Sequence, residues 1–417
     1  MPMRVSADSR NLTRQCLLAL SAIMLCIAAA PAAAQMPQLT HYNSRFYDIH
    51  TNLAKREAQA YGRHMDLIFA EYRKRFADFK PRNQGRMRLF LLRSEQDYHA
   101  FMAELGISAQ NSGCMFFVRP NARGLATWTE GRSRAAAFAV LQHEGFHQFA
   151  YEYIGNGLPT WVNEGIAQYF EDGVVVTRGT RQSIELGLAN MRRAATVKAA
   201  IENDELIDCD ALLNRTGDQW SANLRTNPAL GRLQYDQAWS VTYFLIHGDD
   251  GRYRQAFANY VMLLSQGRDQ REAFAHAFGS TDTEPFRKAW ERFAREHKPD
   301  PLTAGLIKLE FLGQGLRFLQ GRGEAAPGTI DELRERLTAI GFGARRWEPG
   351  MVVEFKADEG ESYEFLGTDG KVRPFQLLEA AGDRLLPRIA APGLKPQPTL
   401  IWMLNDDGEL ISDIEFN

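Results

Sequence analysis

The feature that most constrains this chain is a pair of histidines, His143 and His147, which flank Glu144 in the run Leu-Gln-His-Glu-Gly-Phe-His-Gln. On an α-helix, a spacing of four residues places both imidazoles on one face, so that both can reach one metal ion. Glu144 is rotated by only about 100° from His143, so its carboxylate can lie beside the ion rather than on it. At such a site zinc lowers the pKa of water, and the carboxylate accepts the proton.

The residues around this motif predict a buried helix. Residues 135–154 contain no proline and one glycine, and apolar side chains occupy the histidine face as well as the opposite face. A helix that is apolar on nearly all sides is buried, and buried polar groups need partners. Two histidines that hydrogen-bond inside the core remain the alternative, but the combination of His143, Glu144 and His147 favours a metal.

A third ligand follows in the next predicted helix. After the breakers at residues 155–159, residues 161–171 read as a helix with Pro159 and Thr160 as start signals. A short turn can bring Glu164, early on this helix, back to the histidines, which gives a His2Glu site with an open fourth position. Gly165 would let the two helices approach closely. The alternative role of Glu164 is to complement the helix dipole in the first turn.

Together the two segments resemble the gluzincin metallopeptidases, and more closely the bacterial peptidase MA-like branch that includes the domain catalogued as DUF1570. The resemblance rests on His-Glu-x-x-His followed by Trp-x-x-Glu-Gly-x-Ala-x-Tyr-Phe-Glu, and it covers residues 38–298. It implies one Zn2+ ion held by His143, His147 and Glu164, with Glu144 as the general base. It also implies a peptide or protein substrate.

The same resemblance bears on the kind of peptidase. Related aminopeptidases carry Gly-x-Met-Glu-Asn on a strand along the cleft, and that glutamate holds the free amine of the substrate. This chain has Gly-Cys-Met-Phe-Phe at residues 113–117, with Phe116 in place of the glutamate. An endopeptidase is therefore favoured over an aminopeptidase. A plain core role for Phe116 and Phe117 is equally open.

Two supporting roles are predicted around the metal. A tyrosine or histidine often stabilises the oxyanion formed during peptide hydrolysis, and by resemblance the helix at residues 235–246 reaches the cleft. Tyr235 is nominated, with Tyr243 as the alternative, and packing roles for both remain open. A metal-bound histidine usually donates its other N–H to an acceptor, for which Gln168 and Glu171 are candidates.

The first residues predict export. Three arginines precede an apolar run at residues 16–30, and Pro-Ala-Ala-Ala then offers a cleavage site after Ala34. This is the pattern of a signal peptide, too short for a transmembrane helix, and it predicts a periplasmic or secreted protein. A lipid anchor at Cys26 is the alternative, which Leu25 disfavours because a small residue is expected there.

The net charge limits the kinds of partner that the protein can bind, and the two cysteines outside residues 1–34 allow at most one disulfide between them. Removing residues 1–34 takes three of 49 basic and one of 51 acidic residues, which leaves 46 and 50. This near-neutral balance argues against a nucleic-acid or membrane-surface partner, and no further apolar run reaches 18 residues, so membrane insertion is not expected. Cys114 and Cys209 could form one disulfide in an oxidising compartment or remain two buried thiols.

The predicted fold class is α+β, with a zincin-like catalytic domain at residues 38–298 and a small α+β domain at residues 302–417. The second domain carries no recognisable chemistry, and it could bind a protein partner or cover the cleft. Expected strands lie at residues 41–48, 87–92, 113–118 and 125–128, a hairpin turns near Gly179, and the stretch 216–232 is expected to be an irregular rim or lid. Two helices are expected within residues 252–296, and the other histidines show no second ligand spacing.

These features predict a zinc peptidase in which Glu144 assists the attack of water on the scissile carbonyl. Two rivals remain open. One is a zinc-binding but inactive scaffold that acts through a partner of its C-terminal domain. The other is a zinc hydrolase of non-peptide bonds, since the same water chemistry serves esters and amides.

Overall fold

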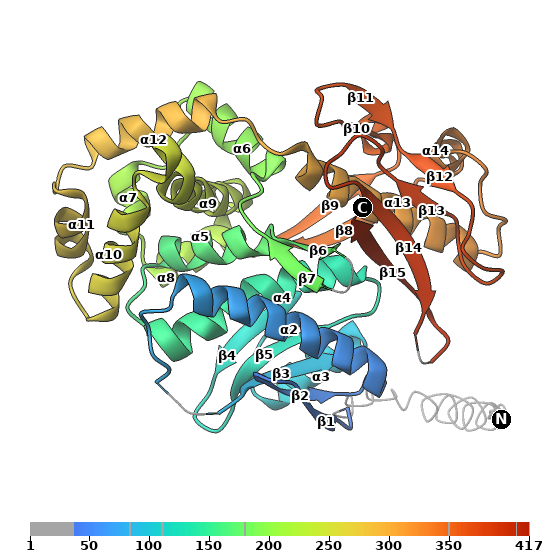
Figure 1. Cartoon of the computed structure of the whole chain (residues 1–417), viewed down its shortest axis with the longest axis horizontal. Helices are drawn as coiled ribbons and strands as arrows, with labels where there is room; N and C mark the ends of the chain where they lie inside the picture. Colours follow the sequence, from blue (N-terminus) through green and yellow to red (C-terminus); the bar gives the residue numbers. More distant parts are fainter. Residues whose placement is uncertain are drawn as a thin grey trace, which may run out of the picture.

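The protein is seen here in a computed structural model that describes residues 37–82, 85–109, 112–178, 181–348, 351–405 and 407–416. The predicted signal peptide and the predicted turn at Gly179 lie outside these residues. The fold is α+β, as the sequence predicts. A mixed sheet, a helical lobe and a C-terminal region surround two central helices, α4 (Arg134–Phe149) and α5 (Thr160–Glu171) (Figure 1).

A five-stranded sheet in the order β1-β2-β3-β5-β4 forms the N-terminal part. The central strands pair in parallel and the outer ones antiparallel. The strands are β1 (Thr40–Asn43), β2 (Tyr47–Thr51), β3 (Met87–Leu92), β4 (Cys114–Val118) and β5 (Arg123–Trp128). The single strand predicted at residues 41–48 is therefore wrong: Ser44 N–H donates to Tyr47 O at 2.9 Å, and the chain turns between β1 and β2.

Helices cover both faces of this sheet. α2 (Lys55–Arg75) and α4 lie on one face, and α3 (Glu95–Glu104), which starts at a Ser94–Asp97 capping box, lies on the other. The alternation of side chains along β3 explains this, because Leu89 and Leu91 enter the core with α2 and α4 while Leu92 joins α3.

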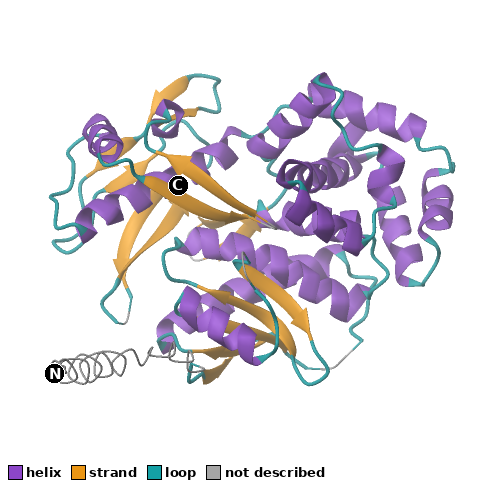
Figure 2. Ribbon diagram, turned by 180° about the vertical axis from the view of Figure 1, so that it is seen from behind, coloured by secondary structure: helices purple, strands orange, loops and turns teal. Residues whose placement is uncertain are grey.

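The helical lobe forms around α9 (Pro228–Gly251), whose central residues are buried. α5 packs against α9, and Figure 2 shows the helices of the lobe gathered on one side, away from most of the strands. The hairpin β6 (Val174–Arg178) and β7 (Arg181–Glu185) precedes the lobe. The other helices of the lobe are α6 (Met191–Glu202), α7 (Cys209–Leu213), α8 (Gly217–Thr226), α10 (Arg254–Ser265), α11 (Gln270–Phe278) and α12 (Glu284–Glu296).

Two predictions in this lobe are wrong. The stretch 216–232, expected to be irregular, contains α8 and the start of α9, because Thr216 and Gln219 form a capping box and Pro228 occupies the first turn of α9. The stretch 252–296 holds three helices rather than two, because Asp269 caps an additional helix, α11.

The C-terminal region (residues 301–416) has its own cluster of buried apolar side chains. It begins with α13 (Pro301–Gly321) and α14 (Ile330–Ala339), and the sheet β12-β13-β14-β15 follows. Its strands are β8 (Gly343–Glu348), β9 (Met351–Lys356), β10 (Glu364–Leu366), β11 (Val372–Pro374), β12 (Gln376–Leu378), β13 (Arg388–Ala390), β14 (Pro398–Leu404) and β15 (Leu410–Phe416), with the 3-10 turn η2 (Gly360–Tyr363) before β10.

Polar contacts hold this region against the N-terminal part. Arg134 of α4 reaches Asp413 at 3.2 Å, and Arg93 reaches Asp407 at 2.7 Å.

Cys114 and Cys209 are both buried and free, so the two cysteines do not form the disulfide that the sequence left open. Among the described residues, no helix combines the length and apolarity needed to cross a bilayer.

Candidate metal centre

α4 presents the two histidines at a fixed separation. Ser133 caps the helix by accepting a hydrogen bond from Ala136 N–H at 3.0 Å. Further along, the Nε2 atoms of His143 and His147 lie 3.1 Å apart. The π-helical turn η1 (Ala150–Ile154) continues the chain. The spacing read from the sequence therefore produces a pair of adjacent imidazoles.

α5 supplies the third ligand. Glu164 Oε2 lies 3.3 Å from His143 Nε2 and 3.6 Å from His147 Nε2. The structure thus brings the three predicted ligands together in a group that can hold a metal ion. The close approach expected at Gly165 is made with α9 and not with α4, because an added Cβ would lie 2.2 Å from Thr242 Oγ1. Gly165 therefore allows α5 to sit deep against α9.

The spacing of these atoms fits a small divalent ion. Tetrahedral ligands with bonds of 2.0–2.1 Å are separated by about 3.3–3.4 Å. The observed separations of 3.1, 3.3 and 3.6 Å lie around this value. Glu164 Oε2 is buried, and its partners among the described residues are the two imidazoles, so the three ligand atoms face one another. Two imidazoles and one carboxylate are the protein ligands of a typical catalytic zinc site, in which water takes the fourth position.

The electrostatics of the centre couple the three ligands. Burial acts to lower the pKa of His143, but the carboxylates of Glu164 and Glu171 outweigh it and raise the pKa to about 10. Burial acts to raise the pKa of Glu164, but the charges of His147 and His143 lower it to about 2. Without metal the His143 imidazole therefore holds a proton that a binding cation must displace.

A buried acid orients the first histidine. Glu171 Oε2 lies 3.1 Å from His143 Nδ1 and 3.1 Å from the guanidinium of Arg193 on α6. The other candidate, Gln168, does not reach the histidine, because its amide donates to Tyr235 O at 3.0 Å. Arg193 was not anticipated, since nothing in its local sequence distinguishes it from a surface arginine.

Glu144 lies beside the three ligands and is not one of them. Its Oε2 accepts a hydrogen bond at 2.9 Å from the backbone N–H of Phe116 on β4. Within the part of the chain that the structure describes, β4 is an outer strand of the sheet and pairs with β5 alone. Phe117 joins the core beside α3, while the half-buried Phe116 packs 5.6 Å from the ring of Tyr151.

The two candidate tyrosines differ in where they lie. Tyr235 is buried against Trp220 of α8, with ring centroids 5.1 Å apart. Burial raises the pKa of Tyr235, and the charges of Glu164 and Glu144 add to the rise, so Tyr235 lies within electrostatic range of the centre. The hydroxyl of Tyr243 instead donates to Gly187 O at 2.9 Å, away from the metal ligands. Trp220 also shows that the stretch predicted to be a rim packs behind Tyr235.

The structure contains a second group of possible metal ligands that the sequence analysis did not predict. His41, Asp48 and His50 lie on the β1–β2 hairpin, with one ligand atom from each within 4.8 Å of the others. His41 hydrogen-bonds Asp48 and pairs directly across the hairpin with His50. Only the register of the hairpin reveals this group, because its members are not spaced for one helix face.

Comparison with known proteins finds one family model that matches about a third of this chain. Residues 137–269, which include both histidines and Glu164, match a family model described as "Protein of unknown function (DUF1570)". A search of curated proteins gave no match.

Proposed function

We propose that this chain is an exported zinc-dependent metallopeptidase of the gluzincin type, related to the peptidase MA-like branch and zincin-like in its catalytic domain. The proposal rests chiefly on one observation. Three ligand atoms from His143, His147 and Glu164 lie 3.1–3.6 Å apart, and the charge of Glu144, a carboxylate outside this set, acts on His147.

The residues divide the chemistry as follows. A bound zinc ion supplies a Lewis acid that polarises the carbonyl and makes water acidic near neutral pH. Glu144 takes one proton from the attacking water and returns it to the leaving amine, so that water is added across the peptide bond. The Phe116 N–H keeps the Glu144 carboxylate beside the centre. Glu171 fixes the ring of His143, and Tyr235 offers its hydroxyl to the developing oxyanion.

The neighbourhood of the centre suits an extended chain as substrate. Among the described strands, β4 pairs with β5 alone, so its other edge can add a peptide as a further strand. Phe116 stands where an amine-binding glutamate would be needed, which supports cleavage away from a free N-terminus. With the predicted signal peptide, the substrate would be a peptide or protein outside the cytoplasm.

Chelator-sensitive hydrolysis of casein by the purified chain tests this proposal. Glu144→Gln should retain zinc and lose hydrolysis by at least about 100-fold, because the metal site survives while the proton carrier does not. An intact zinc site with no hydrolysis in the parent chain would point to a scaffold. Cleavage of an ester panel without cleavage of peptides would point to a different hydrolase.

A further inference from the structure

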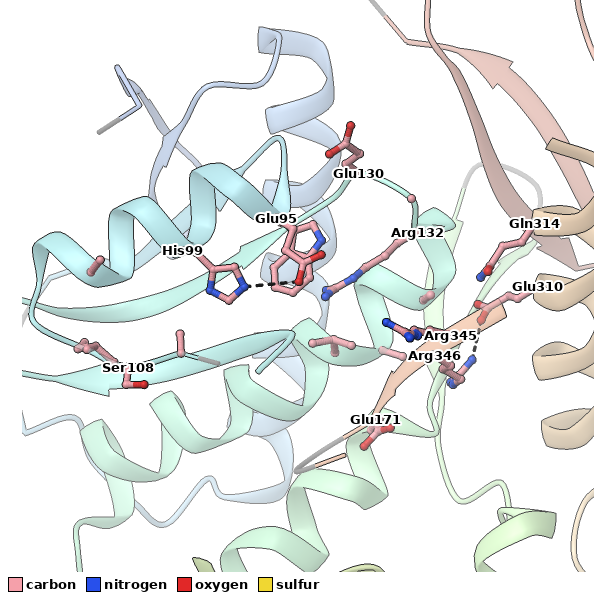
Figure 3. Close-up of a pocket in the computed structure, with 18 residues that line it drawn as sticks. Glu95, His99, Ser108, Glu130, Arg132, Glu171, Glu310, Gln314, Arg345 and Arg346 are labelled. Atoms are coloured by element: carbon pink, nitrogen blue, oxygen red, sulfur yellow. Dashed lines mark hydrogen bonds and ion pairs between the residues drawn. The ribbon is translucent and has the colours of Figure 1, made fainter. Parts of the chain in front are cut away.

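A cavity of about 840 Å³ lies between the N-terminal part of the chain and the C-terminal region (Figure 3). One wall is the first half of α4, including Ala136 and Val140. The facing wall belongs to the C-terminal region, with Gln314 from α13 and Arg345 from β8. Glu171, the residue that orients His143, also lines the cavity.

This cavity lies along the same stretch of α4 as the metal centre. Val140 and Ala136 precede His143 by three and seven residues, which is about 4.5 and 10.5 Å along the helix axis. The chain at residues 107–109, which leads towards β4, lines the cavity from another side. An extended peptide advances about 3.3 Å per residue, so the cavity would receive residues about one to three positions from the scissile bond.

Most charged groups of the cavity are already paired. Three of its four acids have partners: Glu171 meets His143 and Arg193, Glu310 meets Ser133 and Arg346, and Glu95 meets His99. The fourth, Glu130, is exposed to solvent. The acids of the cavity therefore leave little free negative charge in its interior.

Arg132 is different, because it forms no ion pair with any carboxylate of the described residues. Its guanidinium stacks 4.0 Å over the ring of Trp128 and donates to Gly113 O at 2.9 Å and to Thr127 Oγ1 at 3.1 Å. Its buried Nε has no hydrogen-bond partner among the residues that the structure describes, and burial lowers the pKa of Arg132 to about 10. A guanidinium in this state gains from an anion.

Arg345 provides a second cation from the C-terminal region. Its side chain is 73% exposed and pairs at 3.1 Å with Glu354, itself 58% exposed, and such a surface pair is readily exchanged. Figure 3 shows the guanidinium groups of Arg132 and Arg345 directed towards the middle of the cavity.

We propose that this cavity is the substrate subsite of the metal centre and that it takes a carboxylate held by Arg132 and Arg345. The inference rests on the proposed function, which it deepens by naming a substrate class. It also gives the C-terminal region a role, because that region completes the wall of the subsite. The carboxylate is either the C-terminus of a peptide, which would lead to release of short C-terminal fragments, or an acidic side chain near the scissile bond.

Binding to the zinc-loaded Glu144→Gln variant tests this without turnover. Three fluorescent pentapeptides of one sequence are compared: a free acid, a C-terminal amide, and an amide with aspartate as the last residue. The free acid should bind roughly tenfold more tightly than the plain amide, as a charge-assisted pair with arginine would give. If the aspartyl amide binds equally tightly, the source is a side chain, and if it binds weakly, the source is the C-terminus.

The variant Arg345→Glu should abolish the preference for a carboxylate. Arg271→Glu is the matched control, because Arg271 is 70% exposed and pairs at 3.3 Å with the exposed Asp210 on the helical lobe, and it should keep the preference. Arg132 also supports Gly113 and Thr127, so Arg345 is the safer position to change. Equal binding of all three peptides, no measurable binding of any, or an unchanged preference in Arg345→Glu would overturn the proposal. The same comparison without zinc separates this outcome from failure of the metal site, since loss of zinc would leave the preference in place.

Discussion

The substitution Glu171→Gln tests whether the Glu171 carboxylate strengthens metal binding through its contact with His143. The glutamate carboxylate contacts two groups, His143 Nδ1 and the guanidinium of Arg193, both at 3.1 Å. Glutamine keeps the size and one acceptor oxygen but removes the charge that stabilises a metal-bound imidazole. Arg193 keeps Asp172 at 2.9 Å, so the substitution does not strand a buried cation. The loss should therefore fall on the metal and not on the fold.

The expected loss of zinc affinity is about 10- to 100-fold, or roughly 1.4–2.7 kcal/mol, as is typical when the partner of a ligating histidine is removed. Zinc affinity is measured by competition with a chromophoric chelator at one fixed pH, because protons compete for His143. Glu152→Gln is the matched control. Glu152 is also a buried acid paired with an arginine, Arg123 at 3.0 Å, but it does not touch a histidine of the centre.

The comparison has a clear negative outcome. If Glu171→Gln holds zinc as tightly as the parent chain, the acid does not support the ligand and the account of the centre is wrong at this point. Equal losses in Glu171→Gln and Glu152→Gln would assign the effect to general destabilisation of the fold.

Three further predictions test other parts of the account. Tyr235→Phe should lower kcat of peptide hydrolysis by about 10²–10³-fold with little change in KM, and an unchanged kcat would return Tyr235 to a packing role. Gly165→Ala should cost about 1–3 kcal/mol in chemical denaturation, because its Cβ would meet Thr242 Oγ1 at 2.2 Å and Ala238 O at 2.6 Å, and full stability would contradict this contact. Burial lowers the pKa of His64 to about 3, below its unfolded value of 6.5. The stability that comes from keeping His64 neutral is therefore complete above pH 6.5, and it is lost as the pH falls below that value. Between pH 7 and 4.5 this loss is roughly 2–3 kcal/mol, which His64→Phe should remove from the pH dependence of unfolding.

Local signals were enough to place the ligands. The i, i+4 spacing of His143 and His147 depends only on helical geometry, and the breakers before α5 bring Glu164 back within one short connection. The helix N-terminus at Thr216 was also readable, because Gln219 completes a capping box, but the polar composition of that stretch favoured a loop.

Other features depend on how elements pack, which local sequence does not specify. Gln168 and Glu171 lie one turn apart on α5, and only the crossing of α4 and α5 decides that Glu171 faces His143. Gly165 predicted that two helices pack closely, but it did not indicate that the partner of α5 is α9. The cavity joins residues as far apart in the sequence as Glu95 and Arg346, and one of its walls exists only because the C-terminal region docks beside α4.

Metal content of the purified mature protein tests the central claim most directly. Elemental analysis should find about one zinc ion per chain, none in His147→Ala, and an unchanged content in His41→Ala, where the change falls on the β1–β2 hairpin. A parent chain without zinc, or a His147→Ala variant that keeps it, would contradict the account.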